Sequence, residues 1–447
     1  CLVLAPQIMG REVVTIEGLR GPEGGMNDLQ QAFVEYGAVQ CGYCIPGLII
    51  AGEALLAGNP LPTRAEIREG IAGNLCRCTG YHQIVDAIEI AAERRRQKHS
   101  TTAALRVDGP EKAMGTAKYV GDFRVPGALV ARALRSPVPH GRIVHLDVAP
   151  AFEVSGVRAV VTAADFVDHG RFGFPRKDNF VLAWQKVRYA GEGIAVVAAE
   201  SEEAAEEGVR AIVLELEPLP VVADMEQALS PEAPVIPDIV SEEGKERHGN
   251  LCVTHIVRNS DPEHILAECA VRLDETYTTP FQEHAYLEPE AVLAIPNPDG
   301  SVVLYACNQS PFINRDTAAS VLGLPPEKVR VIQAYVGGSF GGKDEVVYQM
   351  SAQTAKLALI TGRPVRMVFT REESIIVSYK RNATRIHIRL GADRYGRLRA
   401  AKVEGWFDGG AYSAETVLTA WRGAMHLAGA YRYEAVHGDA HVVYTNN

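Results

Sequence analysis

Four of the eight cysteines in this 447-residue chain lie between residues 41 and 78. They occur in two short motifs, QCGYCIPG at 40–47 and NLCRCTGY at 74–81. A C-x2-C pair followed by a C-x-C pair can form disulfides, bind zinc or bind an iron–sulfur cluster. Disulfides need an oxidising compartment and are denser in smaller chains, so we disfavour them. Zinc sites commonly take two C-x2-C pairs, whereas thiolates at helix ends with spare backbone N–H groups suit a [2Fe–2S] cluster equally well. The spacing alone leaves zinc and the cluster open.

The elements that must position these cysteines are helices, because residues 27–97 show helical patterns. Pro46 suits the first turn of a helix over GLIIAGEALLAG, and Thr63 with Glu66 forms a capping box ahead of EIREGIAG. Ile84 and Ile88 fall on one face of a helix over HQIVDAIEIAAERRR. The cysteines therefore lie at helix ends, where backbone N–H groups have no partner within the helix.

A second candidate site is the glycine loop in VIQAYVGGSFGGKDEVVYQM, which reads as strand, loop and helix. The loop fits G-x4-G-K up to Lys343, but Asp344 stands where a phosphate-binding loop needs Ser or Thr, and its carboxylate would repel phosphate. The loop also fits G-x-S-x-G around Ser339, with Asp408 and His426 following in hydrolase order, which indicates a serine hydrolase as an alternative of a different class. A third interpretation is structural, because glycines let a strand and a helix pack closely.

Other residues of metal-ligand type read as structural. His284, Glu288 and Glu290 lie close in sequence, but Pro289 breaks the helix that would bring them together. The cysteines of the second half are isolated and read as core residues: Cys252, Cys269 and Cys307.

The composition describes a globular protein of several domains. The length predicts roughly two to four domains, and hydrophobic residues make up 47% of the chain. A net charge of −10 argues against nucleic acid or an anionic membrane as the main partner. No apolar run approaches the roughly 18–20 residues that cross a bilayer. The chain starts at Cys1 without methionine and stops at VVYTNN, so we expect a fragment. For the whole protein we expect a cytoplasmic location.

The cysteine motifs carry a family resemblance. AFVEYGAVQCGYCIPG followed by GNLCRCTGYHQIVDAI resembles the helical iron–sulfur domain of the xanthine dehydrogenase/aldehyde oxidoreductase molybdenum hydroxylases, nearly unbroken from 30 to 90. The resemblance implies that Gln40 and Cys78 lie beside the amino group of the pterin, on the electron path. Cys1 matches the last ligand of another cluster, in a preceding plant-type ferredoxin domain. The resemblance implies one complete [2Fe–2S] ligand set: Cys41, Cys44, Cys76 and Cys78.

The implied fold is multidomain, with an all-α four-helix [2Fe–2S] domain followed by α+β molybdopterin-binding domains. A polar, basic stretch at 93–104 and a Pro- and Glu-rich patch at 230–246 indicate the main boundaries. We expect the end of a ferredoxin domain at 1–22, the helical cluster domain at 23–92, a linker at 93–105, an α/β hammerhead-like domain at 106–235, and the first part of the molybdopterin-binding domain at 236–447.

On the molybdenum side, GGSFGGKD resembles the GG-x-FGGKE loop that touches the molybdenum cofactor through backbone N–H groups. This match implies that Phe340 and Gly341 are cofactor contacts and that Phe340 excludes water. Gln309, in CNQSPF, matches the family glutamine that binds an oxo ligand; from the sequence alone, an amide that caps a loop is the alternative. RVDGPEKAMGTAKYVGD, RSPVPHGRIVHLD, VRYAGEGIAVVAAES and DGGAYS resemble successive blocks of the molybdenum subunit.

Two charged residues bear on the substrate. Asp344 occupies the slot of a glutamate that binds the heterocycle in purine-oxidising relatives, and Arg422 matches their arginine. Such an arginine neutralises negative charge that builds on a ring carbonyl. Aldehyde-oxidising relatives tend to carry uncharged residues in both slots. The pair predicts that Asp344 and Arg422 orient an N-heteroaromatic, purine-like substrate, with an aldehyde as the alternative; two solvated loop charges are the structural alternative.

The resemblance implies hydroxylation of an electron-poor carbon with water as the oxygen source, and electron flow through the pterin to iron–sulfur clusters. The family's base glutamate and its FRGFG-type substrate loop follow the YTNN block, so we expect this fragment alone to be inactive. The short passage from 97 to 106 leaves no place for a flavin domain, so we expect no FAD in this chain and an electron acceptor protein or separate flavoprotein as partner. The family is commonly homodimeric. A further hypothesis is a non-catalytic iron–sulfur electron-transfer module.

Overall fold

The computed structural model divides the chain into two compact units, which are described separately. It describes residues 3–21, 24–97, 106–237, 241–242, 245–246 and 249–447. The first unit contains the chain up to Phe123 together with Ala285–Pro289 and Gln333–Phe340, and the second unit contains the remainder. Within the described ranges, every helix is too short or too polar to reach across a bilayer.

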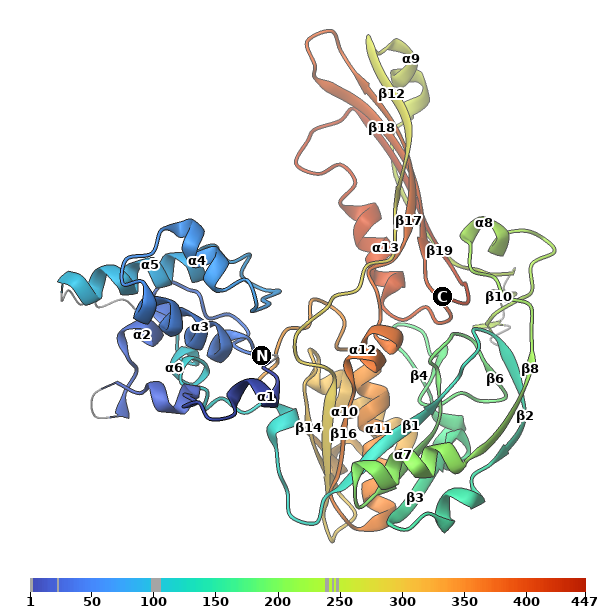
Figure 1. Cartoon of the computed structure of the whole chain (residues 1–447). Coiled ribbons are helices and arrows are strands. Elements are labelled where there is room, and N and C mark those ends of the chain that lie inside the picture. The colour runs from blue at the N-terminus through green and yellow to red at the C-terminus, as the bar shows by residue number, and fades with distance from the viewer. Residues whose placement is uncertain (1–2, 22–23, 98–105, 238–240, 243–244, 247–248) are drawn as a thin grey trace. The chain divides into compact units, whose positions relative to one another are not determined.

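The first unit is built mainly from helices (Figure 1). Four of them, α2 to α5, pack around a core in which Phe33, Leu48 and Ile88 are fully buried. The predicted capping box is present, because Thr63 and Glu66 each bond the other's backbone N–H at the start of α4. The predicted all-α four-helix domain is confirmed. In chain order the elements are α1 (Ala5–Ile8), η1 (Ile16–Leu19), α2 (Asp28–Glu35), α3 (Ile45–Gly58), α4 (Arg64–Gly70), α5 (His82–Gln97), α6 (Gly109–Ala113) and η3 (Val120–Asp122).

The core of the second unit is a mixed seven-stranded sheet in the order β15-β14-β13-β16-β1-β7-β3. Its strands are β1 (Leu129–Arg135), β3 (Val157–Thr162), β7 (Gly193–Ala199), β13 (Ala291–Pro296), β14 (Val302–Ala306), β15 (Val329–Gln333) and β16 (Val365–Val368). The helices α10 (Pro311–Leu322) and α11 (Glu345–Thr361) pack together, α11 also lies against β13, and α7 (Glu202–Ala211) packs on β1 and β7.

This sheet crosses the domain boundary that the sequence predicts at residues 235 and 236. Strand β1 pairs in parallel with β16 and antiparallel with β7, so the predicted hammerhead-like segment shares a sheet with later residues. The sequence misses this because strand pairing over such a separation leaves no local signal.

Smaller elements complete this part of the second unit. They are β2 (Gly141–Asp147), β6 (Lys186–Val187) and β8 (Val213–Pro218) in a three-stranded sheet, the pairs β4 (Arg171–Phe172) with β5 (Asn179–Phe180) and β9 (Ser241–Glu242) with β10 (Lys245–Glu246), the helices α8 (Met225–Ala228) and α12 (Arg371–Val377), and the 3-10 turns η4 (Ala149–Glu153), η5 (Ala163–Asp165), η6 (Val167–Gly170) and η7 (Pro326–Lys328).

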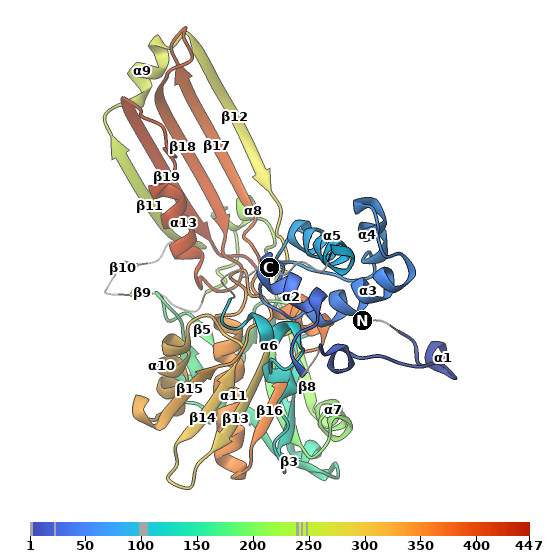
Figure 2. The same ribbon diagram turned by 90° about the vertical axis from the view of Figure 1, so that its left-hand side faces the viewer.

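A second, five-stranded sheet has the order β11-β19-β18-β17-β12 (Figure 2). Its only parallel pair among the described strands is β18 with β19. One end of the sheet is covered by α13 (Thr416–Met425), which contacts β19 and β11, and α9 (Pro262–Glu268) packs on β18. The strands are β11 (Leu251–Asn259), β12 (Val271–Thr279), β17 (Thr384–Ala392), β18 (Leu398–Asp408) and β19 (Ala435–Val443).

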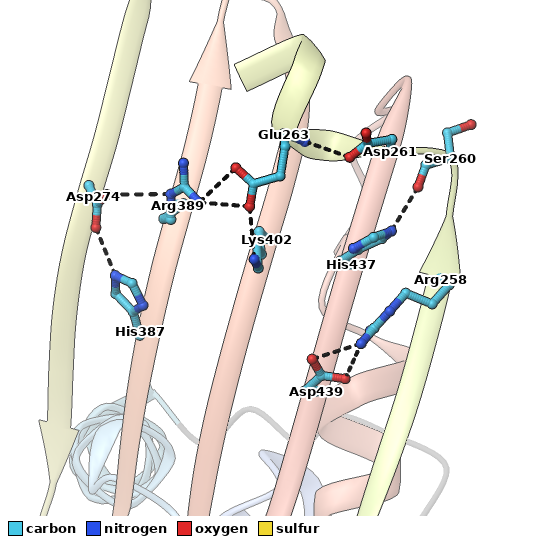
Figure 3. Close-up of polar contacts among 10 residues, drawn as sticks. All are labelled: Arg258, Ser260, Asp261, Glu263, Asp274, His387, Arg389, Lys402, His437 and Asp439. Atoms are coloured by element: carbon cyan, nitrogen blue, oxygen red, sulfur yellow. Dashed lines mark hydrogen bonds and ion pairs between the residues drawn. The ribbon is translucent and has the colours of Figure 1, made fainter. Parts of the chain in front are cut away.

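One face of this five-stranded sheet carries a network of charges (Figure 3). Arg389 and Lys402 lie directly opposite each other on β17 and β18, an arrangement that is repulsive by itself. Glu263 of α9 accepts from both cations, at 2.9 and 2.8 Å. Asp274 on β12 accepts from His387 at 2.7 Å and lies 3.4 Å from Arg389. The α9 carboxylate therefore makes this register tolerable.

The helix α11 begins with an unusual buried carboxylate. Glu345 is its first residue and is only 6% exposed. Burial raises the pKa of Glu345 to about 8, and the charges of Glu415, Asp344 and Asp178 act in the same direction. Desolvation disfavours the charged form of a carboxyl group, so Glu345 is mostly protonated at neutral pH in the folded chain.

We predict that Glu345 makes folding stability fall as pH rises. Between the ordinary pKa of 4.5 and the folded value of about 8, the unfolded chain loses this proton while the folded chain keeps it. The contribution is fully present below the unfolded pKa and is lost as pH rises through this window, at up to about 1.4 kcal/mol per pH unit. Thermal unfolding from pH 4.5 to 8 should show a steeper decline for the parent than for Glu345→Gln; equal slopes would contradict the assignment.

Candidate functional site

The first candidate site is formed by two loops at helix ends in the first unit. Cys44 is the N-cap residue of α3, and Cys41 lies three residues before it. Cys76 and Cys78 lie in the turn between α4 and α5. Tyr81 closes this turn with a positive φ of 68°, and its hydroxyl accepts the N–H of Cys76 at 2.8 Å. The structure therefore brings the C-x2-C and C-x-C motifs to the same place.

The four thiols form a hydrogen-bonded series in the order Cys44, Cys76, Cys78 and Cys41. A hydrogen bond from Cys78 lowers the pKa of Cys41 to about 7, and one from Cys44 lowers the pKa of Cys76 to about 2. The same bonds raise the pKa values of the donors Cys78 and Cys44. Alternating donors and acceptors show that the sulfur atoms face each other closely enough to share protons.

The arrangement of the thiols bears on which metal centre they could hold. Among the described residues, no group of three or more His, Cys, Asp or Glu side chains is arranged to hold a metal ion as it stands. A structural zinc ion needs four ligands around one point, whereas a [2Fe–2S] cluster needs two thiolates on each iron. The series has Cys44 and Cys76 at one end and Cys78 and Cys41 at the other, so it offers two thiols to each of two irons. The residues present therefore fit the cluster.

The remaining predictions on the cluster side concern Gln40, Cys1 and the isolated cysteines. Gln40 is half-buried, and its carbonyl oxygen accepts from the ammonium group of Lys112 at 3.0 Å. Cys1 lies outside the described residues. The isolated cysteines of the second half are all buried, as expected: Cys252, Cys269 and Cys307.

The glycine loop runs from the end of β15 to the start of α11 and has irregular backbone. The N–H of Gly337 donates to Glu288 Oε2 at 2.7 Å, which gives this glutamate a structural role. Phe340 is 48% exposed and has a φ of 52°, in the left-handed region that non-glycine residues rarely adopt. Gly341 follows with a φ of 97°. Such strained positions cluster at functional sites.

A hydrogen-bonded chain ties this loop to α11 within the second unit. The N–H of Gly341, which the family resemblance directs at the cofactor, donates to Gln309 Oε1 at 2.9 Å. Gln309 Nε2 donates to Asp344 Oδ2 at 2.7 Å, and the Tyr348 hydroxyl donates to Asp344 Oδ1 at 2.8 Å. Since a backbone N–H needs an acceptor and a carboxylate needs a donor, this chain determines which end of the Gln309 amide is nitrogen.

Asp344 is enclosed by this network. It is 4% exposed, and burial raises its pKa although the hydrogen bonds from Tyr348, Ser310 and Gln309 act against that shift. The sequence places Asp344 against a substrate, whereas the structure bonds both of its oxygens within the protein. Tyr348 was missed by the sequence analysis, because nothing in EVVYQM distinguishes a helix-core tyrosine from one that holds a carboxylate.

Arg422 lies on α13, where its side chain is exposed. A second carboxylate lies in its neighbourhood: Glu415, the N-cap residue of α13, has its pKa raised first by burial and then by the charge of Asp344, while Arg422 lowers it. The loop before Glu415 is anchored by Ser413, whose N–H donates to buried Asp178 at 3.0 Å. Glu415, which the sequence did not single out, therefore senses the charges of both Asp344 and Arg422.

The alternative sites lack the required arrangement. Asp408 accepts from Thr445 at 2.6 Å and from Asn447 at 2.8 Å, while His426 Nδ1 contacts the carbonyl of Arg422 at 2.8 Å. The acid and base of a hydrolase triad therefore do not pair, and the serine hydrolase hypothesis for Ser339 is not supported by the structure. Lys343 is fully buried, so it is not presented to a phosphate as a phosphate-binding loop requires.

Three domain families match successive parts of the chain. Residues 15–89 match the [2Fe-2S] binding domain, residues 114–220 match the aldehyde oxidase and xanthine dehydrogenase a/b hammerhead domain, and residues 244–447 match the molybdopterin cofactor-binding domain. None of the three is a flavin-binding domain.

Similar proteins include several oxidoreductases. The chain is 37% identical to the nicotinate dehydrogenase large molybdopterin subunit of Eubacterium barkeri, over 77% of this chain and 78% of that protein. It is 38% identical to a probable xanthine dehydrogenase subunit of Bacillus subtilis, over 77% of this chain and 45% of that protein. The structure of aldehyde oxidoreductase from Desulfovibrio gigas is 27% identical with a TM-score of 0.87, and the match covers 97% of this chain and 50% of that chain.

The chain thus spans about half the length of two of these relatives and more than three quarters of the third. Four thiols gathered at one place, a glycine loop bonded through Gln309, and the domain and sequence matches all agree. The chain belongs to the xanthine dehydrogenase/aldehyde oxidoreductase family of molybdenum hydroxylases.

Proposed function

We propose that the protein containing this chain hydroxylates an N-heteroaromatic substrate with water as the oxygen source and passes the electrons through [2Fe–2S] clusters to an external acceptor. The observation that carries this proposal is the Gln309 amide, held between the Gly341 N–H and the Asp344 carboxylate inside the molybdopterin cofactor-binding domain. The same chain carries the four-thiol site that feeds electrons outward.

By the family resemblance, Gln309, Phe340 and Gly341 would contact the molybdenum–pterin group, and the resemblance also assigns Gln40 and Cys78 to the path by which electrons leave it. When bound, this group supplies two-electron oxidation of a carbon centre. The protein's part is to orient and to exclude water. Phe340 provides an apolar ring on a strained backbone, and the bond from Gly341 keeps the Gln309 amide in one orientation.

The charges around Asp344 support a nitrogen heterocycle. Asp344 and Arg422 both act on the charge of Glu415, so a substrate near Glu415 would meet a hydrogen-bond acceptor and a cation that neutralises charge developing on a ring. Two of the similar proteins, nicotinate dehydrogenase and quinoline 2-oxidoreductase, are named for nitrogen heterocycles. The structure of the quinoline enzyme from Pseudomonas putida is 26% identical with a TM-score of 0.69, and the match covers 77% of this chain and 44% of that chain.

An aldehyde is the second candidate substrate. The structure of the aldehyde oxidoreductase of Desulfovibrio gigas matches 97% of this chain, so the match includes the cluster domain as well as the later domains. This shared domain order favours an aldehyde. For both candidates we propose a cytoplasmic homodimer. We also propose a separate flavoprotein or other protein as electron acceptor, because none of the matched domains binds flavin.

A substrate panel separates the two candidates. With the complete purified enzyme, reduction of an artificial electron acceptor should be at least about tenfold faster, by kcat/KM, with nicotinate, quinoline or hypoxanthine than with aromatic and aliphatic aldehydes. Mass spectrometry of the product in ¹⁸O-labelled water should show one labelled oxygen. Faster turnover of aldehydes would contradict the heteroaromatic proposal, and unlabelled product would contradict hydroxylation by water.

The metal content tests the cluster site. The anaerobically reconstituted chain should contain iron and acid-labile sulfide, should absorb between roughly 400 and 550 nm, and should lose these properties in Cys44→Ser. The matched control is Cys269→Ser, because Cys269 is buried but lies outside the site, and its Sγ–H donates to Ile265 O at 3.1 Å, a bond that a hydroxyl can keep. A colourless chain that binds zinc would contradict the assignment.

The role of Asp344 is tested by two substitutions. Asp344→Ala removes the acceptor of Gln309 Nε2 and Tyr348 OH, whose unmet donors cost about 1–3 kcal/mol each when buried. We expect lower molybdenum content and kcat, with KM little changed. Asp344→Asn should retain most of the molybdenum content and of kcat. The oxygen of the new amide can still accept from Gln309, and the Tyr348 hydroxyl can accept from its nitrogen.

The alternative role gives a different pattern. If Asp344 mainly binds substrate, Asp344→Asn should raise KM and leave molybdenum content and kcat unchanged. Molybdenum content, KM and kcat measured on the same preparations decide between the two roles.

A further inference from the structure

The segment that follows the helical cluster domain turns back onto the loop carrying Cys41. The Lys112 ammonium group donates to the carbonyl of Gln40 at 3.0 Å, and the Tyr119 hydroxyl donates to the carbonyl of Cys41 at 2.8 Å. All of these residues belong to the first unit. Lys112 is 5% exposed and Tyr119 is 8% exposed, so both contacts are shielded from water.

The close approach of the Cys41 loop to Lys112 and Tyr119 depends on Gly42. Its φ is +93°, and a Cβ at this position would lie 2.5 Å from Lys112 Cγ and 2.7 Å from the Tyr119 hydroxyl. No side chain fits there, so the backbone of the loop packs directly against Lys112 and Tyr119. The N–H of Tyr43 bonds the sulfur of Cys41 on the other side of this turn. Lys112 and Tyr119 therefore act as a clamp on the backbone that presents one cluster ligand.

The clamp also brings a buried positive charge close to the Cys41 loop, the ammonium group of Lys112. Lys112 lies 2.6 Å from Asp108 Oδ2, and Arg106 pairs with the same carboxylate, so two cations share one anion. The hydrogen bond from Arg106 is the largest cause that lowers the pKa of Asp108, which is therefore ionised at neutral pH. The nearby Glu111 carboxylate accepts from Tyr335 OH at 2.6 Å and is solvent-exposed. Lys112 is the most buried of these charges, so its field is the least screened by water.

We infer that Lys112 and Tyr119 are positioning residues for the [2Fe–2S] cluster: Tyr119 holds the Cys41 loop in shape, and the buried charge of Lys112 raises the reduction potential of the cluster. Reduction adds one electron to the cluster and breaks no bond, so the site gains one negative charge. A buried cation stabilises the more negative state more strongly, which raises the potential. This inference depends on cluster binding and is independent of the substrate.

The test is an anaerobic redox titration of the full chain carrying its cluster, with dithionite as reductant, mediator dyes and electron paramagnetic resonance of the reduced cluster. Lys112→Met should lower the midpoint potential, and Lys112→Arg should keep it near the parent value. The matched control is Lys118→Met, which removes the same charge from an exposed side chain of the same segment and should leave the potential unchanged. Equal shifts in Lys112→Met and Lys118→Met, or no shift in either, would overturn the inference.

Two further variants protect the test against loss of folding. Asp108→Asn removes the counter-anion and leaves Lys112 in place, so it should move the potential in the opposite direction, upward. Tyr119→Phe keeps every charge but removes the bond to the Cys41 carbonyl; it should accelerate iron release by a chelator and alter the visible circular dichroism, with a smaller change in potential than Lys112→Met. A downward shift in Asp108→Asn, or unaltered iron release in Tyr119→Phe, would count against the clamp. A molybdenum-free preparation suffices, so failure here leaves the proposed hydroxylase function standing.

Discussion

The Cys41 loop and the glycine loop are both irregular backbone, so their polar groups need partners that no helix or strand supplies. Side chains distant in sequence meet this need. Lys112 and Tyr119 donate to the carbonyls of the Cys41 loop, while Glu288 and Gln309 accept the N–H groups of the glycine loop. The shape of each loop is therefore as well determined as that of a regular element, although its own residues are glycine-rich. Rigid loops of this kind can hold a cofactor without a large rearrangement on binding.

Carboxyl groups gather at the start of α11 in a poorly solvated region. Asp344, Glu345 and Asp178 are all buried, and Glu415 is half-buried. Burial is the largest cause that raises the pKa values of Asp344, Glu345 and Glu415, and nearby negative charges add to it for Glu345 and Glu415. Because Glu345 holds its proton at neutral pH, its carboxyl group can donate as well as accept a hydrogen bond.

Local signals in the sequence predicted much of this structure. The helices around the cysteines follow from caps such as Thr63 with Glu66, and the cysteine spacing is itself local. Non-local pairings escaped prediction. Lys112 and the Gln40 carbonyl are 72 residues apart, and a lysine in GPEKAMG gives no hint that its ammonium group reaches a cluster loop. Asp344 was predicted from its position in the loop, but its bonds to Gln309 and Tyr348 depend on how β14 and α11 come together. For the same reason the sheet that joins early and late strands was missed.

The parallel pairing of β1 with β16 has a consequence for how the chain is made. Leu129 is opposite Val365, and Arg132 bonds Val368 across 236 residues. At about 5–20 residues per second, a ribosome needs roughly 10–50 seconds between the synthesis of these two strands. During that interval β1 can pair with β7, which emerges first, but its other edge has no partner. An unpaired apolar strand edge is a template for wrong associations, so this edge of β1 is open to them until β16 has left the ribosome.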